Sequence, residues 1–238
     1  VLQECPAKRP VEVVLLLDAS TSMRWDFDMD PSIDGLLEDL GRRIERAIFG
    51  FQRQGLINER EALYRRLNES PGTDRIVVAK QALTQIVQEG PADVTFAFLS
   101  FNACGAPHDH GSYASTERDA LLSRIQSLQL GDHTALADAL RHAPGYVRSG
   151  RSAEEPANIV LLSDGSDSCN GDPCAAARWL AGELPHTHVN FVAMGRGLEA
   201  MRCVPEATGG LFLEAHNVEE LFSVMSTASG QDLPEHCK

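Results

Sequence analysis

The first apolar run of the chain ends in three oxygen-bearing side chains at alternate positions. The segment VVLLLDASTSM, residues 13–23, places Asp18, Ser20 and Ser22 after five consecutive apolar residues. Alternate residues of an extended turn point the same way, so the three side chains can converge on one ion. Their hard oxygens suit Mg²⁺ or Mn²⁺ better than a soft metal. The structural alternative is that Ser20 caps a following helix and Asp18 closes an Asx-turn.

Two more oxygen-bearing residues stand where they can join this triplet. Asp164 follows the apolar run ANIVLLS, and Thr134 lies in GDHTALADAL, at the expected start of a helix. Ligands of open α/β sheets bind beyond the carboxyl ends of the strands. We therefore expect Asp164 to lie beside Asp18 at one edge of a sheet.

Apolar runs and helical patterns alternate along the chain, which predicts an α/β fold. Near-continuous apolar runs suit strands covered on both faces, as in a parallel sheet. The expected strands are 11–17, 93–101, 157–163, 188–194 and 210–215, and the expected helices include 74–87, 116–128, 172–184 and one opened by Asn217 with Glu220. This order predicts a doubly wound, mostly parallel sheet flanked by helices, in a single domain over residues 1–238.

Residues 24–73 interrupt the alternation between the first strand and its expected helix. Apolar residues recur there at helical spacing: Ile33, Leu37, Leu40, Ile44, Ile48 and Phe51. Asn58 and Glu61 resemble the capping box of a second helix. The segment therefore predicts a helical hairpin inserted after the first strand and packed on the rim of the sheet.

Composition narrows the classes of partner. The 238 residues carry a net charge of −13, which disfavours nucleic acid and anionic membrane surfaces and favours a cation or a basic protein surface. No apolar run approaches the roughly 18 residues that span a bilayer.

The chain has no Gly-x-Ser-x-Gly elbow, no His-Glu-x-x-His and no glycine-rich phosphate loop, so no catalytic residue is predicted. Zinc at Cys104, His108, Asp109 and His110 is disfavoured because no second ligand pair accompanies them.

The order of these motifs resembles the metal-ion-dependent adhesion site of von Willebrand factor A domains. The segments DASTSM, TALADAL, IVLLSDG and EATGGLFLEA match in order between about residues 11 and 226. The resemblance implies that Ser20, Ser22 and Thr134 bind a metal directly, and that Asp18 and Asp164 bind it directly or through water. The sixth position would accept an acidic side chain from a partner.

The resemblance therefore implies a divalent-metal-dependent protein-binding module for adhesion, sensing or assembly, and not an enzyme. Its cofactor would be Mg²⁺, with Mn²⁺ or Ca²⁺ as alternatives, and its partner a protein that presents Asp or Glu. Two features depart from the family: His133 replaces a usually small residue, and the insertion leaves the first loop directly, where it would restrict access. One alternative is a scaffold whose metal is capped by Asp26, Asp28 or Asp30. A less favoured one is a metal-dependent phosphoester hydrolase.

The six cysteines favour disulfides and hence an oxidising compartment. They allow fifteen pairings, among which sequence alone does not choose. The loop SDGSDSCNGDPCAAA resembles a subset of bacterial A domains, which implies a Cys169–Cys174 bridge and a periplasmic, secreted or cell-surface protein whose parent is either anchored in a membrane or free. Chain termini often lie close together, which favours Cys5–Cys237 and leaves Cys104–Cys203.

Overall fold

The computed structural model describes residues 12–30, 32–69, 72–147, 157–195 and 197–231. One six-stranded sheet forms its centre, with strand order β3-β2-β1-β4-β5-β6. Every neighbouring pair is parallel except β2 with β3. The strands are β1 (Glu12–Asp18), β2 (Thr95–Phe101), β3 (His108–Tyr113), β4 (Ala157–Ser163), β5 (Thr187–Ala193) and β6 (Phe212–Glu214).

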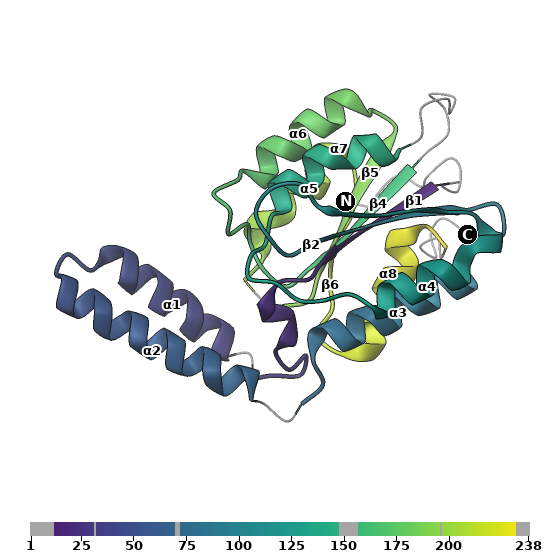
Figure 1. Ribbon diagram of the computed structural model, residues 1–238. Coiled ribbons are helices and arrows are strands. Elements are labelled where there is room, and N and C mark those ends of the chain that lie inside the picture. The colour runs from purple at the N-terminus through teal and green to yellow at the C-terminus, as the bar shows by residue number, and fades with distance from the viewer. Residues whose placement is uncertain (1–11, 31, 70–71, 148–156, 196, 232–238) are drawn as a thin grey trace.

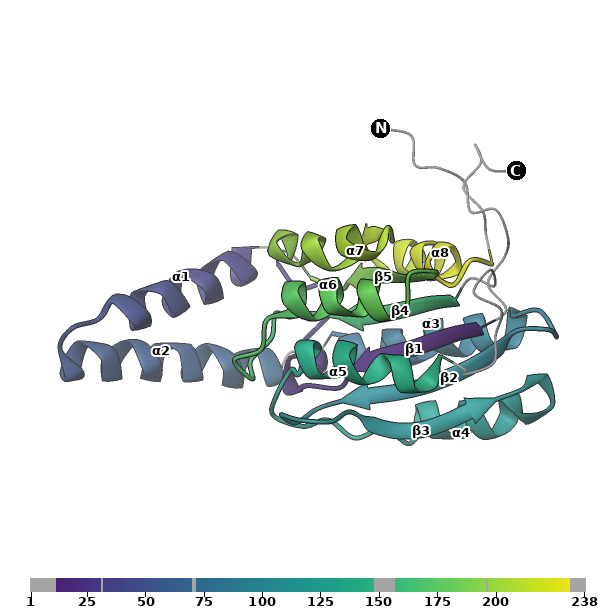
Figure 2. The ribbon, with the colours of Figure 1, turned by 90° about the horizontal axis from the view of Figure 1, so that it is seen from above.

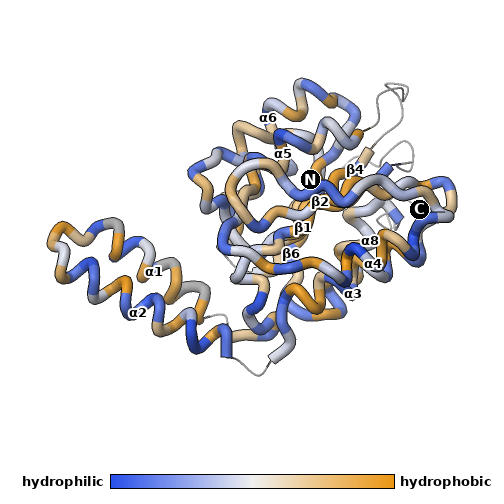
Figure 3. Tube along the Cα trace, viewed as in Figure 1, coloured by the Kyte–Doolittle hydropathy of each residue, from blue (hydrophilic) through white to orange (hydrophobic). Residues whose placement is uncertain are grey.

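Helices cover both faces of this sheet (Figures 1 and 2). The helices are α1 (Ser32–Arg46), α2 (Gly50–Asn68), α3 (Arg75–Glu89), α4 (Arg118–Gln126), α5 (Leu136–His142), α6 (Pro173–Glu183), α7 (Cys203–Thr208) and α8 (Val218–Ser229). Side chains alternate along a strand, so Val13, Leu15 and Leu17 of β1 pack with α3, α4 and α8. Val14 and Leu16 pack with α5, α6 and α7 on the other face. This two-sided burial explains the near-continuous apolar strands, which Figure 3 shows in orange at the centre.

The predicted fold class is confirmed, and one strand was missed. Strand β3, with the sequence HDHGSY, lies antiparallel at an edge of the sheet and is mostly exposed or half-buried. An edge strand with one solvated face needs no apolar run, so its polar sequence gave no signal. His108 and His110 hydrogen-bond Asn102 and Ser100, respectively. Both histidines therefore have structural roles within the sheet.

Helices α1 and α2 form the predicted hairpin, but it projects from the sheet as an arm (Figures 1 and 2). The prediction that it packs on the rim of the sheet was wrong. Ile48 and Phe51 do not continue the stripe of α1, because Ile48 lies in the connection between the helices and Phe51 in the first turn of α2, and both are exposed. Asn58 is not a cap but stands inside α2, where its side chain accepts a hydrogen bond from Gln54. The helix begins eight residues earlier, at Gly50, and the Arg, Glu and Leu residues around Asn58 favour helix strongly enough to continue through it.

Parallel pairing brings the carboxyl ends of β1, β2, β4 and β5 to one edge of the sheet. The segment after β1 leaves this edge and leads into the arm. Because ligands of such sheets bind beyond the carboxyl ends of the strands, the predicted ligand residues must be sought at this edge.

Among the described residues, no helix is both long and apolar enough to cross a membrane.

Candidate functional site

The residues at the carboxyl end of β1 form a closed hydrogen-bonded turn. The Ser20 amide donates to Asp18 Oδ1 at 2.8 Å, and the two hydroxyls of Ser20 and Ser22 lie 3.0 Å apart. Ser163, the last residue of β4, donates its hydroxyl to Asp18 Oδ2 at 2.5 Å. Asp18 therefore closes the Asx-turn considered above, and that turn is also what aims the hydroxyls of Ser20 and Ser22 toward each other.

Asp164 completes a cluster with these residues. The Ser22 hydroxyl donates to Asp164 Oδ1 at 2.7 Å, which joins the β1 turn to the loop after β4. Burial, and then the nearby charge of Asp164, raise the pKa of Asp18 to about 7, while hydrogen bonds from Ser163 and Ser20 lower it. Two buried carboxylates that repel each other form a site short of positive charge. The set of hard oxygens at this point fits a divalent cation such as Mg²⁺.

Arg75 supplies part of that positive charge and was not predicted. Its Nη1 donates to Asp164 Oδ2 at 2.8 Å, and both side chains are buried. Buried arginines are rare unless paired. A sequence signal existed, because Arg75 lies four residues before Ala79 and so continues the apolar stripe of α3. One of the two carboxylates is therefore already paired with a protein cation.

A stack of side chains connects this ion pair to the base of the arm. The Arg75 guanidinium lies 5.6 Å from the centroid of the Trp25 ring, and Trp25 stacks on Tyr64 of α2 at 5.5 Å. The Trp25 indole also donates to Asn68 Oδ1 at 3.2 Å. The C-terminal end of α2 is therefore linked through Trp25 to Arg75, which pairs with Asp164.

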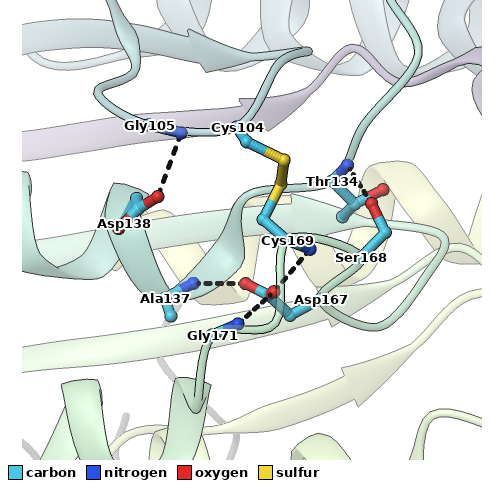
Figure 4. The surroundings of a disulfide bond; sticks show 9 residues. All are labelled: Cys104, Gly105, Thr134, Ala137, Asp138, Asp167, Ser168, Cys169 and Gly171. Atoms are coloured by element: carbon cyan, nitrogen blue, oxygen red, sulfur yellow. Dashed lines mark hydrogen bonds between the residues drawn. A yellow bond between two sulfur atoms is a disulfide. The ribbon is translucent and has the colours of Figure 1, made fainter.

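Thr134 lies against the loop after β4, just before α5. Its amide donates to Ser168 Oγ at 2.8 Å, and its carbonyl accepts from the Ser168 amide at 2.9 Å (Figure 4). A methyl group built on Gly165 would lie 4.0 Å from Thr134 Oγ1, so the Thr134 hydroxyl faces the residue next to Asp164. Asp167 of the same loop accepts a hydrogen bond from the Ala137 amide, in the first turn of α5. Asp18, Ser20, Ser22 and Asp164 thus share one hydrogen-bonded cluster, and Thr134 lies beside the loop that carries Asp164.

Two of the three predicted disulfide pairs, Cys169–Cys174 and Cys104–Cys203, were wrong. Cys104, after β2, is bonded to Cys169, after β4, and their Cα atoms lie 5.4 Å apart (Figure 4). Cys174 is bonded to Cys203, the first residue of α7. The sheet brings the segment after β2 near the loop after β4, and the Asp167 carboxylate, which accepts from the amides of Cys169 and Gly171, shapes the turn that presents Cys169 to Cys104.

Cys174 differs because it lies in the first turn of α6, which packs against α7. The predicted Cys169–Cys174 and Cys104–Cys203 bridges are therefore replaced by two long-range bridges. The first bridge holds the loop after β4 from within, and the second holds the first turn of α6, just beyond that loop. Cys5 and Cys237 lie outside the described residues.

Two other candidate metal groups are explained by local bonds. Asp26 and Asp30 accept hydrogen bonds from the amides of Asp28 and Ser32 in their own loop. Ligand atoms of Cys104, His133 and Cys169 lie within 4.8 Å of one another, but the two sulfurs are bonded together and offer no thiolate.

Known proteins share both sequence and fold with this chain. The model of the von Willebrand factor type A domain matches residues 65–166. The uncharacterized protein YwmD of Bacillus subtilis is 28% identical over 89 residues, which cover 36% of this chain and 38% of YwmD. The matched part thus spans well under half of that relative.

Three solved structures show the same fold at low identity. An aerotolerance-related membrane protein from Bacteroides fragilis has a TM-score of 0.61 and 15% identity, over 93% of this chain and 99% of that one. A von Willebrand factor type A protein from Catenulispora acidiphila has a TM-score of 0.59 and 15% identity, over 94% and 42%. Proximal thread matrix protein 1 from the mussel byssus, with its metal-ion-dependent adhesion motif occupied by zinc, has a TM-score of 0.55 and 14% identity, over 92% and 45%. The chain therefore has the fold of von Willebrand factor type A domains, and residues 65–166 match the sequence model of that family.

Proposed function

We propose that this chain is a divalent-metal-dependent protein-binding module that acts in adhesion, sensing or assembly. The observation that carries the proposal is the hydrogen-bonded cluster of Asp18, Ser20, Ser22 and Asp164 at the carboxyl edge of the sheet, with Thr134 beside the loop that carries Asp164. Domains of this fold are generally interaction modules. The zinc in the mussel protein supports a metal at the corresponding motif.

Each residue of the cluster has a definite part in this proposal. Ser20, Ser22 and Thr134 would supply hydroxyl oxygens, and Asp18 and Asp164 would supply charge directly or through water. When bound, Mg²⁺ would supply a Lewis-acidic position for a carboxylate of the partner. Mn²⁺ and Ca²⁺ are the alternative ions. That the chain is not an enzyme remains a prediction.

The capped scaffold is less well supported than an accessible site. Its proposed caps were Asp26, Asp28 and Asp30; the carboxylates of Asp26 and Asp30 accept amides of their own loop, and Asp28 is exposed. The arm that follows projects from the domain (Figure 1). An extracytoplasmic location remains a proposal, supported by the two disulfides of the described part.

A capture experiment tests this function. The purified chain is immobilised and exposed to cell-envelope extract in Mg²⁺ or in EDTA. Ser20→Ala/Ser22→Ala removes two hydroxyls of the cluster, and Ser123→Ala/Ser127→Ala removes two exposed hydroxyls at the end of α4 as a matched control. We expect a partner that is retained only in Mg²⁺, released by excess glutamate, and lost only in the first variant. Retention that ignores EDTA and both variants would contradict a metal-bridged contact.

A further inference from the structure

The far end of the arm carries large apolar side chains where a turn should be polar. Residues 47–49 connect α1 to α2, and Ile48, Phe49 and Phe51 are 89%, 59% and 77% exposed. The two Phe rings stack with centroids 6.1 Å apart. Figure 3 shows hydrophobic segments along the arm, well away from the core of the sheet.

Folding requirements do not explain this composition. Phe49 holds the N-cap position of α2 with extended backbone, at φ −96° and ψ 131°, and makes no capping hydrogen bond. Ser, Thr, Asp or Asn would satisfy an amide of the first turn there. Natural sequences break such local rules chiefly at functional sites. The tip therefore has the composition of a binding surface.

The charge of the same segment differs from that of the whole chain. Residues 41–55, GRRIERAIFGFQRQG, hold four arginines and one acidic residue, a formal net charge of +3 in a chain of net charge −13. Arg42, Arg43, Arg46 and Arg53 are all exposed. Asp39 lies 3.9 Å from Arg42 and 3.5 Å from Arg43, but these half-exposed pairs are weak. We call residues 41–55 the arm tip.

The arm also separates this tip from the acidic body. The 19 residues of α2 extend about 28 Å at 1.5 Å per residue. The Debye length at physiological ionic strength is about 8 Å, so repulsion between the body and an anionic surface is largely screened over that distance. The net charge that disfavours an anionic membrane for the whole molecule therefore does not disfavour it for the tip.

We propose that the arm tip docks into the interface of an anionic lipid bilayer. Ile48, Phe49 and Phe51 would enter the boundary between headgroups and acyl chains, and the arginines around them would lie among the lipid phosphates. Arginine stems can lie along apolar surface while their charged ends remain in water. Three exposed apolar side chains at the end of a projecting arm, with four exposed arginines in the same segment, fit a lipid surface better than a protein pocket. This inference does not depend on the metal site.

Vesicle co-sedimentation tests the proposal with the whole chain. We expect binding to vesicles of phosphatidylcholine with phosphatidylglycerol and little binding to phosphatidylcholine alone. Phe49→Ser/Phe51→Ser should weaken binding at least about tenfold. Trp179→Ser, which removes an aromatic side chain that is 45% exposed on α6, should leave binding unchanged. Circular dichroism verifies that each variant retains its helices.

A fluorescence measurement separates insertion from adsorption. In a Trp179→Phe background, Phe51→Trp places an indole at the tip. The Trp179→Phe protein, whose remaining tryptophan is Trp25, is the reference. We expect the emission of the Phe51→Trp protein to shift to the blue on anionic vesicles only, and the emission of the reference to stay unchanged. Failure of the wild type to bind either vesicle, or equal binding by the Phe49→Ser/Phe51→Ser variant, would overturn the proposal. Self-association that needs both phenylalanines, without vesicle binding, would assign the tip to a second copy of the chain and equally overturn it.

Discussion

The cluster at the carboxyl edge and the arm tip use opposite means of presenting functional groups. At the edge, Asp18 and Asp164 are buried, bonded to neighbouring hydroxyls and Arg75, and adjacent to a loop fastened by two disulfides. At the tip, Ile48 in the three-residue connection and Phe51 in the first turn of α2 are exposed. Binding of a metal ion requires a few oxygen atoms at fixed positions, whereas binding to a fluid lipid surface requires only exposed apolar and cationic side chains. The two regions should therefore respond very differently to mutation.

The largest effect should come from Arg75→Met. This change leaves Asp164 beside Asp18 with no protein cation, and breaking a buried ion pair typically costs about 3 kcal/mol or more. We expect urea unfolding in EDTA to show that loss, and Mg²⁺ to recover more stability than in the wild type, because the site is more negative. The control Arg118→Met removes an arginine that donates to the carbonyls of Gly90 and Pro91. An unchanged Mg²⁺ response in Arg75→Met would show that Arg75 does not balance the cluster.

The next largest effect should come from Cys104→Ser/Cys169→Ser. This bridge closes a separation of 65 residues, and losing such a crosslink typically costs about 2–4 kcal/mol of unfolding free energy. Cys174→Ser/Cys203→Ser, with a separation of 29, is the matched control. We expect both to lower stability in urea. Only the first should also reduce the response to Mg²⁺, because Cys169 adjoins the Ser168 that holds Thr134. Equal Mg²⁺ responses would separate the bridge from the site.

At the tip, a substitution should stabilise the protein locally. Phe49→Asp places a capping carboxylate at the start of α2, which is typically worth about 1 kcal/mol. Amide hydrogen exchange in the first turns of α2 should slow about fivefold while vesicle binding is lost. The reference is Gln52→Asp, which adds the same charge three residues further on. Faster exchange in Phe49→Asp would mean that Phe49 stabilises the arm, and the contrast between the two regions would fail.

The smallest effect on stability should come from Phe51→Ser. An exposed side chain without buried contacts usually contributes within about 0.5 kcal/mol. We expect an unchanged midpoint in urea, in contrast to Arg75→Met. A loss above about 1 kcal/mol would indicate that the arm tip packs against another part of the chain.

The sequence predicted five of the six strands of the sheet, because each of the five carries its own apolar run. Asp18 and Asp164 follow buried strands, and parallel pairing necessarily brings such ends to one edge. The disulfides could not be predicted in this way. Their pairing depends on which loops meet across β1 and on the turn that Asp167 imposes on Cys169.

Hydrophobic periodicity could not predict the end of α1 or the partner of Arg75. Ile48 continues the spacing of α1 but lies beyond its last residue, Arg46, because the chain turns there. Spacing does not reveal where this helix ends, because the nearest glycine, Gly50, stands at the start of α2 and not directly after Arg46. Arg75 was readable as a charge on an apolar stripe, but its partner Asp164 lies 89 residues away and is brought close only by the fold.

Calorimetric titration of Mg²⁺ into the EDTA-treated chain tests the central claim most directly. The wild type and Ser20→Ala/Ser22→Ala are compared, with Ser123→Ala/Ser127→Ala as the matched control. The account predicts one Mg²⁺ site per chain in the wild type and the control, and a loss of at least about tenfold in affinity in the first variant. Absence of Mg²⁺ binding in the wild type, or equal affinity in all three proteins, would contradict the assignment of the cluster as a metal site.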